Sequence, residues 1–319
     1  MNLWSKIKES ACDLLVAPSY GAAGYRIRSE RWQPLLEGVM DGKVVVVTGA
    51  NSGLGYATAK ALAGLGGHVV MVCRNPERGE QALGELRGGH PRGTLSLELC
   101  DMGDILQVQA LASRITTEHR RVDVLVNNAG VMIATRELTS AGIEKSFATN
   151  VLGGFVLTLG LESSLRAAQG RVIHVTSGGM YTQRLDLDDP FWEKKPYDGV
   201  KAYAQTKRAQ VILNECFAKR WHGSGLTSNA MHPGWAATPG VQSSLPRFER
   251  LLRNQLRNAD QGADTSVWLA ASPEVAGVSG KFFFDREERR THVLPWTSDP
   301  DGAGGRLWAL CEGLKGQPV

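Results

Sequence analysis

A tyrosine and a lysine four residues apart are the side chains of this sequence that are best suited to acid–base chemistry. Tyr203 and Lys207 lie in a segment, residues 202–220, that is predicted to be helical, so both side chains project from one face. A free phenol has a pKa of about 10 and is a poor acid or base at neutral pH. A cation beside it stabilises the phenolate and lowers that pKa. Such a pair is more often an exposed lysine over a packed ring, so the neighbouring motifs must decide whether it is catalytic.

A glycine-rich bend near the start of the chain is suited to binding a phosphate group. The stretch "VVVVTGANSGLG", residues 44–55, indicates a strand buried on both faces, then a bend with glycines at 49, 53 and 55. Glycine tolerates positive φ and lets backbone N–H groups approach a pyrophosphate, and the helix that follows adds partial positive charge. We therefore expect a dinucleotide here, bound by Thr48, Gly49, Asn51, Ser52, Gly53, Leu54 and Gly55.

The end of the second predicted strand indicates which dinucleotide is bound. An acid there would hydrogen-bond the ribose hydroxyls of NAD, but the sequence "CRNPER" places Arg74 at this point. A guanidinium fits the 2′-phosphate of NADP, although a solvated surface arginine is the common alternative. The missing acid favours NADP(H). Asp101 and Met102 follow the next strand, where Asp101 would reach the adenine amino group, and the small residues Asn128, Ala129 and Gly130 would lie against the adenosine.

The elements that must position these residues alternate along the chain. Strands are predicted at 44–48, 68–73, 95–100, 122–127, 171–176 and 226–231. Helices are predicted at 55–64, over the segment "ERGEQALGELR" that ends at Arg87, and at 105–118, 142–161 and 202–220. This alternation indicates βαβ units with right-handed crossovers. The predicted fold is therefore α/β, a doubly wound (Rossmann) parallel sheet in a single domain over residues 41–285. Residues 1–40 form an N-terminal extension and residues 286–319 a C-terminal tail with one short helix, near 306–314, that covers the site or a partner subunit.

Composition narrows the classes of partner. The chain has 319 residues, 42% hydrophobic and 21% charged, which is ordinary for a globular protein with a real core. A net charge of +4 without a basic and aromatic block argues against nucleic acid. Five scattered cysteines indicate free thiols in a reducing compartment rather than disulfides or a metal site.

The first fifteen residues, "MNLWSKIKESACDLL", predict a short amphipathic helix and no secretory signal. Packing of this helix on its own domain or on a twin subunit is favoured over a peripheral membrane contact. No apolar run reaches the length of a bilayer span. The predicted localisation is cytoplasmic, with organellar targeting and peripheral membrane association left open.

Taken together, the motifs resemble the short-chain dehydrogenase/reductase family. The shared features are a serine after the fifth strand, Tyr203-x-x-x-Lys207, Thr48-Gly-x-x-x-Gly-x-Gly55, Asp101, Asn127-Asn-Ala-Gly130, and Pro233-Gly234 after the sixth strand. They run from about Lys43 to Asp285. The extension before Lys43 and the segments "VTSGGM", "MHPGWAATPGV" and "GKFFFDRE" further resemble one dehydrogenase/reductase subgroup of this family.

This resemblance implies an NADP-dependent oxidoreductase that acts on CH–OH or C=O groups through Asn150, Ser177, Tyr203 and Lys207. Read as a carbonyl reductase, the nicotinamide gives a hydride to the carbonyl carbon, Tyr203 protonates the oxygen and Ser177 steadies it. Lys207 binds the nicotinamide ribose and tunes Tyr203, and Asn150 holds a water that relays protons. Thr176 is the alternative to Ser177, which is favoured because relatives with a Ser-Ser pair here use the second residue.

The resemblance also adds Tyr203, Lys207, Pro233, Gly234 and Thr238 to the cofactor-binding residues, the last three beside the nicotinamide carboxamide. The substrate is expected to be a small apolar carbonyl or alcohol, because Trp235, Leu245 and Phe248 follow the sixth strand. A second group, Met180, Phe191, Trp192 and Tyr197, lies between the serine and the tyrosine, where loop packing is the commoner explanation.

Two other functions compete with the reductase. A catalytically silent NADP-binding sensor or scaffold would keep the fold but has no need of Tyr203. A nucleotide-sugar epimerase or dehydratase usually carries a Gly-x-x-Gly-x-x-Gly turn and a longer C-terminal domain, which this sequence lacks. A homo-oligomer is compatible with the family, but no residue fixes its size.

Overall fold

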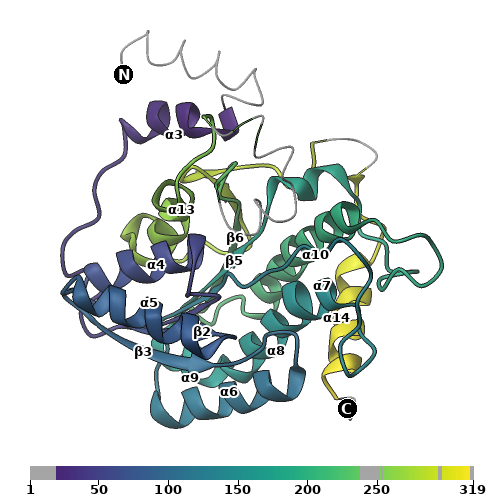
Figure 1. Ribbon diagram of the computed structural model, residues 1–319, viewed down its shortest axis with the longest axis horizontal. Coiled ribbons are helices and arrows are strands. Elements are labelled where there is room, and N and C mark those ends of the chain that lie inside the picture. The colour runs from purple at the N-terminus through teal and green to yellow at the C-terminus, as the bar shows by residue number, and fades with distance from the viewer. Residues whose placement is uncertain (1–18, 238–249, 251, 253, 294–296, 317–319) are drawn as a thin grey trace.

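The structure is a computed structural model that describes residues 19–237, 250, 252, 254–293 and 297–316 (Figure 1). The predicted N-terminal helix and the predicted site residues Thr238, Leu245 and Phe248 lie outside these residues.

The predicted doubly wound sheet is confirmed. It has eight strands in the order β3-β2-β1-β4-β5-β6-β7-β8, and only β7 and β8 pair antiparallel. The strands are β1 Val44–Thr48, β2 His68–Cys73, β3 Thr94–Leu99, β4 Val124–Asn127, β5 Arg171–Val175, β6 Thr227–Met231, β7 Phe282–Phe284 and β8 Glu287–Glu288. The strand order reverses between β1 and β4, and ligands of such sheets bind at the carboxyl ends beside that point.

The valine run of β1 explains why this strand lies at the centre. Val45 and Val47 face one hydrophobic core, whereas Val46 faces the other, and all three are fully buried. A strand covered on both faces has no need of alternating polar residues, so an uninterrupted apolar run is stable there.

Helices cover both faces of the sheet (Figure 1). On one face lie α4 (Gly53–Gly64), α5 (Pro76–Gly88) and α13 (Ala259–Ala271). On the other lie α6 (Ile105–Glu118), α8 (Gly153–Gly160), α9 (Glu162–Ala168) and α10 (Gly199–Arg220). The sequence did not predict α9, α13, β7 or β8, and it also missed α3 (Ala22–Ser29), which lies in the N-terminal extension.

The single helix predicted over residues 142–161 is wrong. The segment divides into α7 (Lys145–Phe147), the π-helical turn η1 (Ala148–Leu152) and α8, and no helix covers residues 142–144. A π turn leaves backbone groups outside the regular i→i−4 pattern and is frequent at functional sites.

The C-terminal helix α14 (Ala303–Lys315) packs on its own chain. Trp308 contacts Phe155 of α8 and Phe217 of α10 edge-on, with ring centroids 4.9 and 5.0 Å apart. The buried Leu307 and Cys311 belong to the same core. The helix therefore completes the core around α8 and α10. The sequence predicted instead that it covers the active site or packs on a partner subunit.

Within the described part of the chain, no single helix has the length and hydropathy of a membrane span. One pair, Lys145–Gly160 and Glu162–Ala168, bent by 60°, meets those criteria jointly, and it lies in the core of this fold.

Candidate active site

The glycine bend after β1 forms a close-fitting backbone cradle. Gly49 has φ +67° and Gly53 has φ +53°, a region that favours glycine. A Cβ on Gly55 would lie only 2.3 Å from the Gly49 carbonyl oxygen. All three glycines are therefore required by geometry, and the main chain of the bend is open to a close approach.

The bend is tied to the end of β4. The Asn128 side-chain amide donates to the Thr48 carbonyl at 2.7 Å, and the Thr48 hydroxyl accepts from the backbone N–H groups of Asn128 and Ala129 at 3.0 and 2.9 Å. Asn128 and Thr48 thus hold the cradle in place. Leu54 packs towards α13, where a Cβ on Gly262 would lie 2.6 Å from its Cδ2, so it offers a ligand its main chain.

The N-terminus of α4 points its first turn into this cradle. Helix α4 begins at Gly53, two residues earlier than predicted, and Ser52 occupies the N-cap without a side-chain hydrogen bond to the first turn. Helix N–H groups without a side-chain cap suit an anion. Together with the glycines, this geometry fits the pyrophosphate of a dinucleotide.

Arg74 and Asp101 lie beside each other at the ends of β2 and β3. Their closest atoms, Arg74 Nη1 and Asp101 Oδ2, are 3.9 Å apart, and the Arg74 side chain is 62% exposed. The other carboxylate oxygen of Asp101 accepts from Gly103 N–H at 2.9 Å. Arg74 is thus placed to meet an anionic group, with Asp101 as a weak partner. Met102 is different, because its side chain belongs to the core and only its main chain is available.

Three of the four predicted catalytic residues, Ser177, Tyr203 and Lys207, lie together at the carboxyl end of β5. The Ser177 side chain faces that of Tyr203 closely enough to lower the pKa of the phenol, and the Ser177 hydroxyl accepts from Gly179 N–H at 3.2 Å. Lys207 Nζ lies 5.5 Å from the centre of the Tyr203 ring and donates to the Val175 carbonyl at 3.0 Å. The i, i+4 spacing on α10 therefore places both side chains as expected.

The alternative Thr176 has a different role. Its hydroxyl donates to the Met231 carbonyl at 3.0 Å, and its side chain is buried. That hydroxyl therefore links β5 to β6, while the partly exposed Ser177 faces Tyr203.

The pKa values of the pair move in directions set by burial. Burial raises the pKa of Tyr203 to about 12, and the hydrogen bond from Ser177 opposes this rise. Burial lowers the pKa of Lys207 to about 7. The lysine was expected to lower the phenol pKa, but the ammonium group is hydrogen-bonded to Val175 and desolvation dominates both side chains.

Asn150 lies in the π turn and is fully engaged. Its amide nitrogen donates to the Val131 carbonyl and to the Thr206 hydroxyl, both at 2.9 Å, and its amide oxygen accepts from Val131 N–H at 2.7 Å. Its backbone carbonyl accepts from the Gln210 side chain at 2.7 Å. The sequence did not single out Gln210, although it lies three residues after Lys207 on the same helix.

Gly130 joins the cofactor side of the site to the catalytic side. A Cβ here would lie 3.2 Å from Lys207 Nζ and 3.4 Å from Asn150 Oδ1. The loop after β4 therefore passes directly over both side chains.

The segment after β6 carries Pro233 and Gly234 beside the site. Gly234 has φ +74°, and a Cβ there would meet Arg257 Nε at 2.5 Å and the Tyr20 carbonyl at 2.7 Å. Sequence reasoning missed Tyr20 and Arg257, since neither belongs to a local motif. A glycine needed for close approach was the signal that could have pointed to them.

Two buried histidines flank the site. Burial lowers the pKa of His174 to about 4, and its ring stacks on Phe217, which agrees with the core role predicted for it. Burial and the nearby guanidinium groups of Arg257, Arg289 and Arg28 lower the pKa of His232 well below its usual value. Both are therefore neutral at pH 7.

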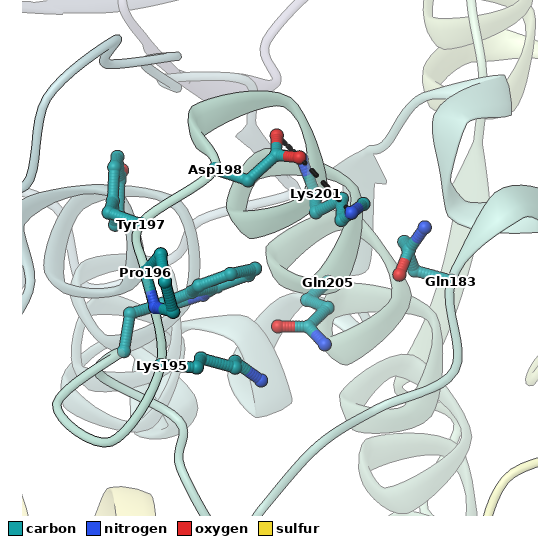
Figure 2. Close-up of a pocket in the computed structure, with 8 residues that line it drawn as sticks. Gln183, Lys195, Pro196, Tyr197, Asp198, Lys201 and Gln205 are labelled. Carbon is teal, nitrogen blue, oxygen red and sulfur yellow. Dashed lines mark hydrogen bonds and ion pairs between the residues drawn. The ribbon is translucent and has the colours of Figure 1, made fainter.

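The aromatic residues between Ser177 and Tyr203 pack away from the catalytic residues. Met180 is buried, Phe191 contacts Phe147 edge-on, and Trp192 contacts Tyr197 in the same way. A cavity of about 520 Å³ lies there, lined by Gln183, Trp192, Lys195, Pro196, Tyr197, Asp198, Lys201 and Gln205 (Figure 2).

This cavity is separate from the catalytic residues. At 100° per residue, Lys201 and Gln205 lie on the face of α10 opposite to Tyr203 and Lys207. Its lysines are paired, Lys195 with Asp186 at 2.6 Å and Lys201 with Asp198 at 3.3 Å.

Comparison with known proteins shows which family the chain resembles. The family described as short chain dehydrogenase matches residues 43–247. The chain is 42% identical to "Dehydrogenase/reductase SDR family member 12" of Homo sapiens over 86% of each chain, and this relative is the subgroup that the sequence segments resemble. It is 35% identical to "Retinol dehydrogenase 13" of Homo sapiens, over 86% of this chain and 85% of that one. A solved structure from Beutenbergia cavernae with NADP bound at low occupancy is 25% identical, with a TM-score of 0.64 over 76% of this chain and 94% of that chain.

Proposed function

The chain belongs to the short-chain dehydrogenase/reductase family, as its motifs predict, and on this premise we propose that it is an NADP-dependent oxidoreductase. Its proposed reaction interconverts a carbonyl group and an alcohol, with an apolar ketone or aldehyde as substrate. When bound, the nicotinamide supplies or accepts the hydride. One relative is named a retinol dehydrogenase, which supports an apolar substrate.

The observation that carries the proposal is that the Ser177 hydroxyl acts on the Tyr203 phenol beside Lys207, where it lowers the pKa of that phenol against the effect of burial. A carbonyl oxygen that accepts from both hydroxyls is polarised by Ser177 and protonated by Tyr203. Lys207 lies under the Gly130 loop, where it would hold a ribose hydroxyl. Asn150 fixes that loop through Val131 and thereby the position of Lys207.

The raised pKa of Tyr203 determines which form of the phenol is present at pH 7. A phenol whose pKa is raised to about 12 stays protonated at pH 7 and is ready to donate. For the reverse reaction the same phenol must first lose its proton. We propose carbonyl reduction as the activity to test first, because the protonated phenol is the form that donates to a carbonyl oxygen.

Arg74 supports NADP over NAD. It extends from the end of β2, and the main chain of the bend is hydrogen-bonded to that strand, since Gly49 N–H donates to the Val72 carbonyl at 2.8 Å. Asp101 lies 3.9 Å from Arg74 and would reach the adenine side of the same nucleotide. A guanidinium that is largely exposed loses little solvation on meeting a phosphate.

A silent NADP-binding sensor or scaffold is the second candidate function. It would keep the cradle and Arg74, but it would show no dependence on Tyr203.

The test is a fluorescence titration of the purified protein with NADPH and NADH. We expect NADPH to bind at least tenfold more tightly, with Arg74→Ala removing the difference. Arg121→Ala is the matched control, because Arg121 is 61% exposed and is also paired with an aspartate, but it precedes β4 and so lies at the amino ends of the strands, away from the cradle. Failure to bind either nucleotide would refute the proposal of an NADP-dependent oxidoreductase.

Turnover then separates the two candidates. With NADPH and a panel of aldehydes and ketones, Tyr203→Phe should lower kcat by about 10²–10⁴-fold while nucleotide affinity stays within twofold. Tight NADPH binding without a turnover that depends on Tyr203 would favour the sensor.

A further inference from the structure

Tyr20 of the N-terminal extension lies directly against the catalytic serine turn. A Cβ on Gly178, the residue after Ser177, would lie 3.2 Å from Tyr20 Cε1. The Tyr20 ring stacks on His232 at 5.1 Å between centroids and on Phe284 at 5.0 Å. It also lies 5.9 Å from Trp235. His232 and Phe284 are buried below, whereas Tyr20 and Trp235 are partly exposed. The extension thus adds an aromatic surface beside Ser177.

The main chain fixes this surface to the segment after β6. Trp235 N–H donates to the Tyr20 carbonyl at 2.9 Å, and the Trp235 carbonyl accepts from Arg257 N–H at 2.7 Å. Gly234 permits the close approach, as described above. Tyr20 and Trp235 therefore hold a set position relative to Ser177.

A buried ion cluster of Arg28, Asp285 and Arg257 anchors the same segment. The Asp285 carboxylate accepts from Arg28 at 2.6 Å and from Arg257 at 2.8 Å, and all three side chains are about 1% exposed. Arg28 also donates to the Ser19 carbonyl and hydroxyl at 3.0 and 2.7 Å. Asp285 itself has φ +53°, a strained conformation for this residue.

Burying the charges of this cluster carries a large desolvation cost. The desolvation of buried charges largely offsets their mutual attraction, so such a cluster is weak evidence for stability alone. Its contacts hold the residue before Tyr20 in one place. A device that sets the position of a partly exposed ring beside a catalytic hydroxyl is what a substrate-contacting surface requires.

We propose that Tyr20 and Trp235 bind the apolar body of the substrate, with Tyr20 as a specificity-determining residue supplied by the N-terminal extension. The inference rests on the proposed function, because the surface acts on a carbonyl held at Ser177 and Tyr203. Partly exposed aromatic rings favour flat or conjugated apolar groups, which stack on them. The favoured substrates are therefore carbonyl compounds with an aromatic or conjugated body.

The test uses the full chain saturated with NADP⁺ and titrated with 2-naphthaldehyde in a calorimeter. Tyr20→Ala should weaken aldehyde binding about tenfold, while Tyr20→Phe, which keeps the ring, should stay within twofold of the wild type. The affinity for NADP⁺ should be similar in all three proteins, and the titrations are made well below the melting temperature of Tyr20→Ala, which should fall because the ring no longer packs on His232 and Phe284. Equal aldehyde affinity in wild type and Tyr20→Ala, including no binding in either, overturns the inference.

Kinetics give a second readout that a structural role would not move. Tyr20→Ala should lower kcat/KM about tenfold for 2-naphthaldehyde and less than twofold for acetaldehyde, which is too small to reach the rings. An equal loss for both aldehydes contradicts a specificity role. A wild type that does not bind NADP⁺ refutes the proposed function itself and, with it, this inference, whereas NADP⁺ binding with unchanged aldehyde selectivity refutes the inference alone.

Discussion

The side-chain amide of Gln210 donates a hydrogen bond to the backbone carbonyl of Asn150 at 2.7 Å. The carbonyl belongs to the π turn η1, where regular helical hydrogen bonding is interrupted. Gln210 therefore gives the buried Asn150 carbonyl a hydrogen-bond donor from α10, the helix that carries Tyr203 and Lys207. The π turn and α10 are therefore linked at Asn150, one of the predicted catalytic residues.

Replacing Gln210 by leucine should lower kcat about tenfold, because Asn150 loses the contact that holds its backbone. The melting temperature should fall by a few degrees, since the buried Asn150 carbonyl loses this hydrogen bond. Gln205→Leu is the control, as Gln205 lies on the opposite face of α10 beside the cavity. Unchanged kcat in Gln210→Leu would refute a positioning role.

Gly130→Ala should place a methyl group 3.2 Å from Lys207 Nζ and 3.4 Å from Asn150 Oδ1. Either the loop or the lysine must move, so kcat should fall at least tenfold in steady-state assays. Gly84→Ala serves as the control, because no atom lies within 4 Å of its added Cβ. That change should stabilise α5 by about 0.5–1 kcal/mol. Full activity in Gly130→Ala would show that the close approach has no catalytic role.

Lys207→Met should abolish turnover without destabilising the protein. Burial lowers the pKa of Lys207 to about 7, so the folded chain disfavours the charged lysine, and the unfolded chain binds more protons up to the ordinary pKa of 10.5. The wild type should therefore gain stability from this residue as the pH rises above 7. Thermal unfolding of both proteins checks this, with a larger benefit from methionine expected at pH 6.5 than at pH 9. The reverse order would contradict the assignment.

Acid should destabilise the protein partly through His174. Its pKa falls from 6.5 unfolded to about 4 folded, so below pH 6.5 the unfolded chain binds a proton that the folded chain refuses. Stability from this residue is complete above pH 6.5 and is lost as the pH falls to 4, by about 3 kcal/mol. Denaturant titrations at several pH values should show a shallower loss for His174→Leu than for the wild type. Part of the remaining slope should come from His232 and His68, because burial lowers the pKa of both in the same direction. Identical slopes would exclude His174.

Local sequence signals were sufficient to predict the strands and helices of the Rossmann core. The bounds of β1, β2 and α6 match the prediction, because each ends at a glycine, a polar residue or a cap that interrupts the pattern. The Tyr203 and Lys207 spacing likewise places both side chains on one face. Helix α13 was missed although Asn258 and Gln261 form a capping box at its start.

Features that depend on tertiary contacts could not be predicted from local sequence signals. The π turn at Asn150 depends on Gln210 across the packed helices, and the direction of the Tyr203 pKa depends on burial. Tyr20 is held against the serine turn by a buried ion cluster, whose members come from both ends of the chain. Periodicity and spacing carry no information on such pairings.

The contact between Arg28 and Asp285 joins residues that are 257 positions apart. Closing so long a loop carries an entropic cost, and the contact can form only after nearly the whole chain has left the ribosome. The strands from β1 to β6 are synthesised earlier and can begin to pair while Asp285 is still untranslated. The aromatic surface beside Ser177 is therefore assembled late. Translation that stops before residue 285 yields a chain with the nucleotide cradle but without the ion cluster that holds this surface in place.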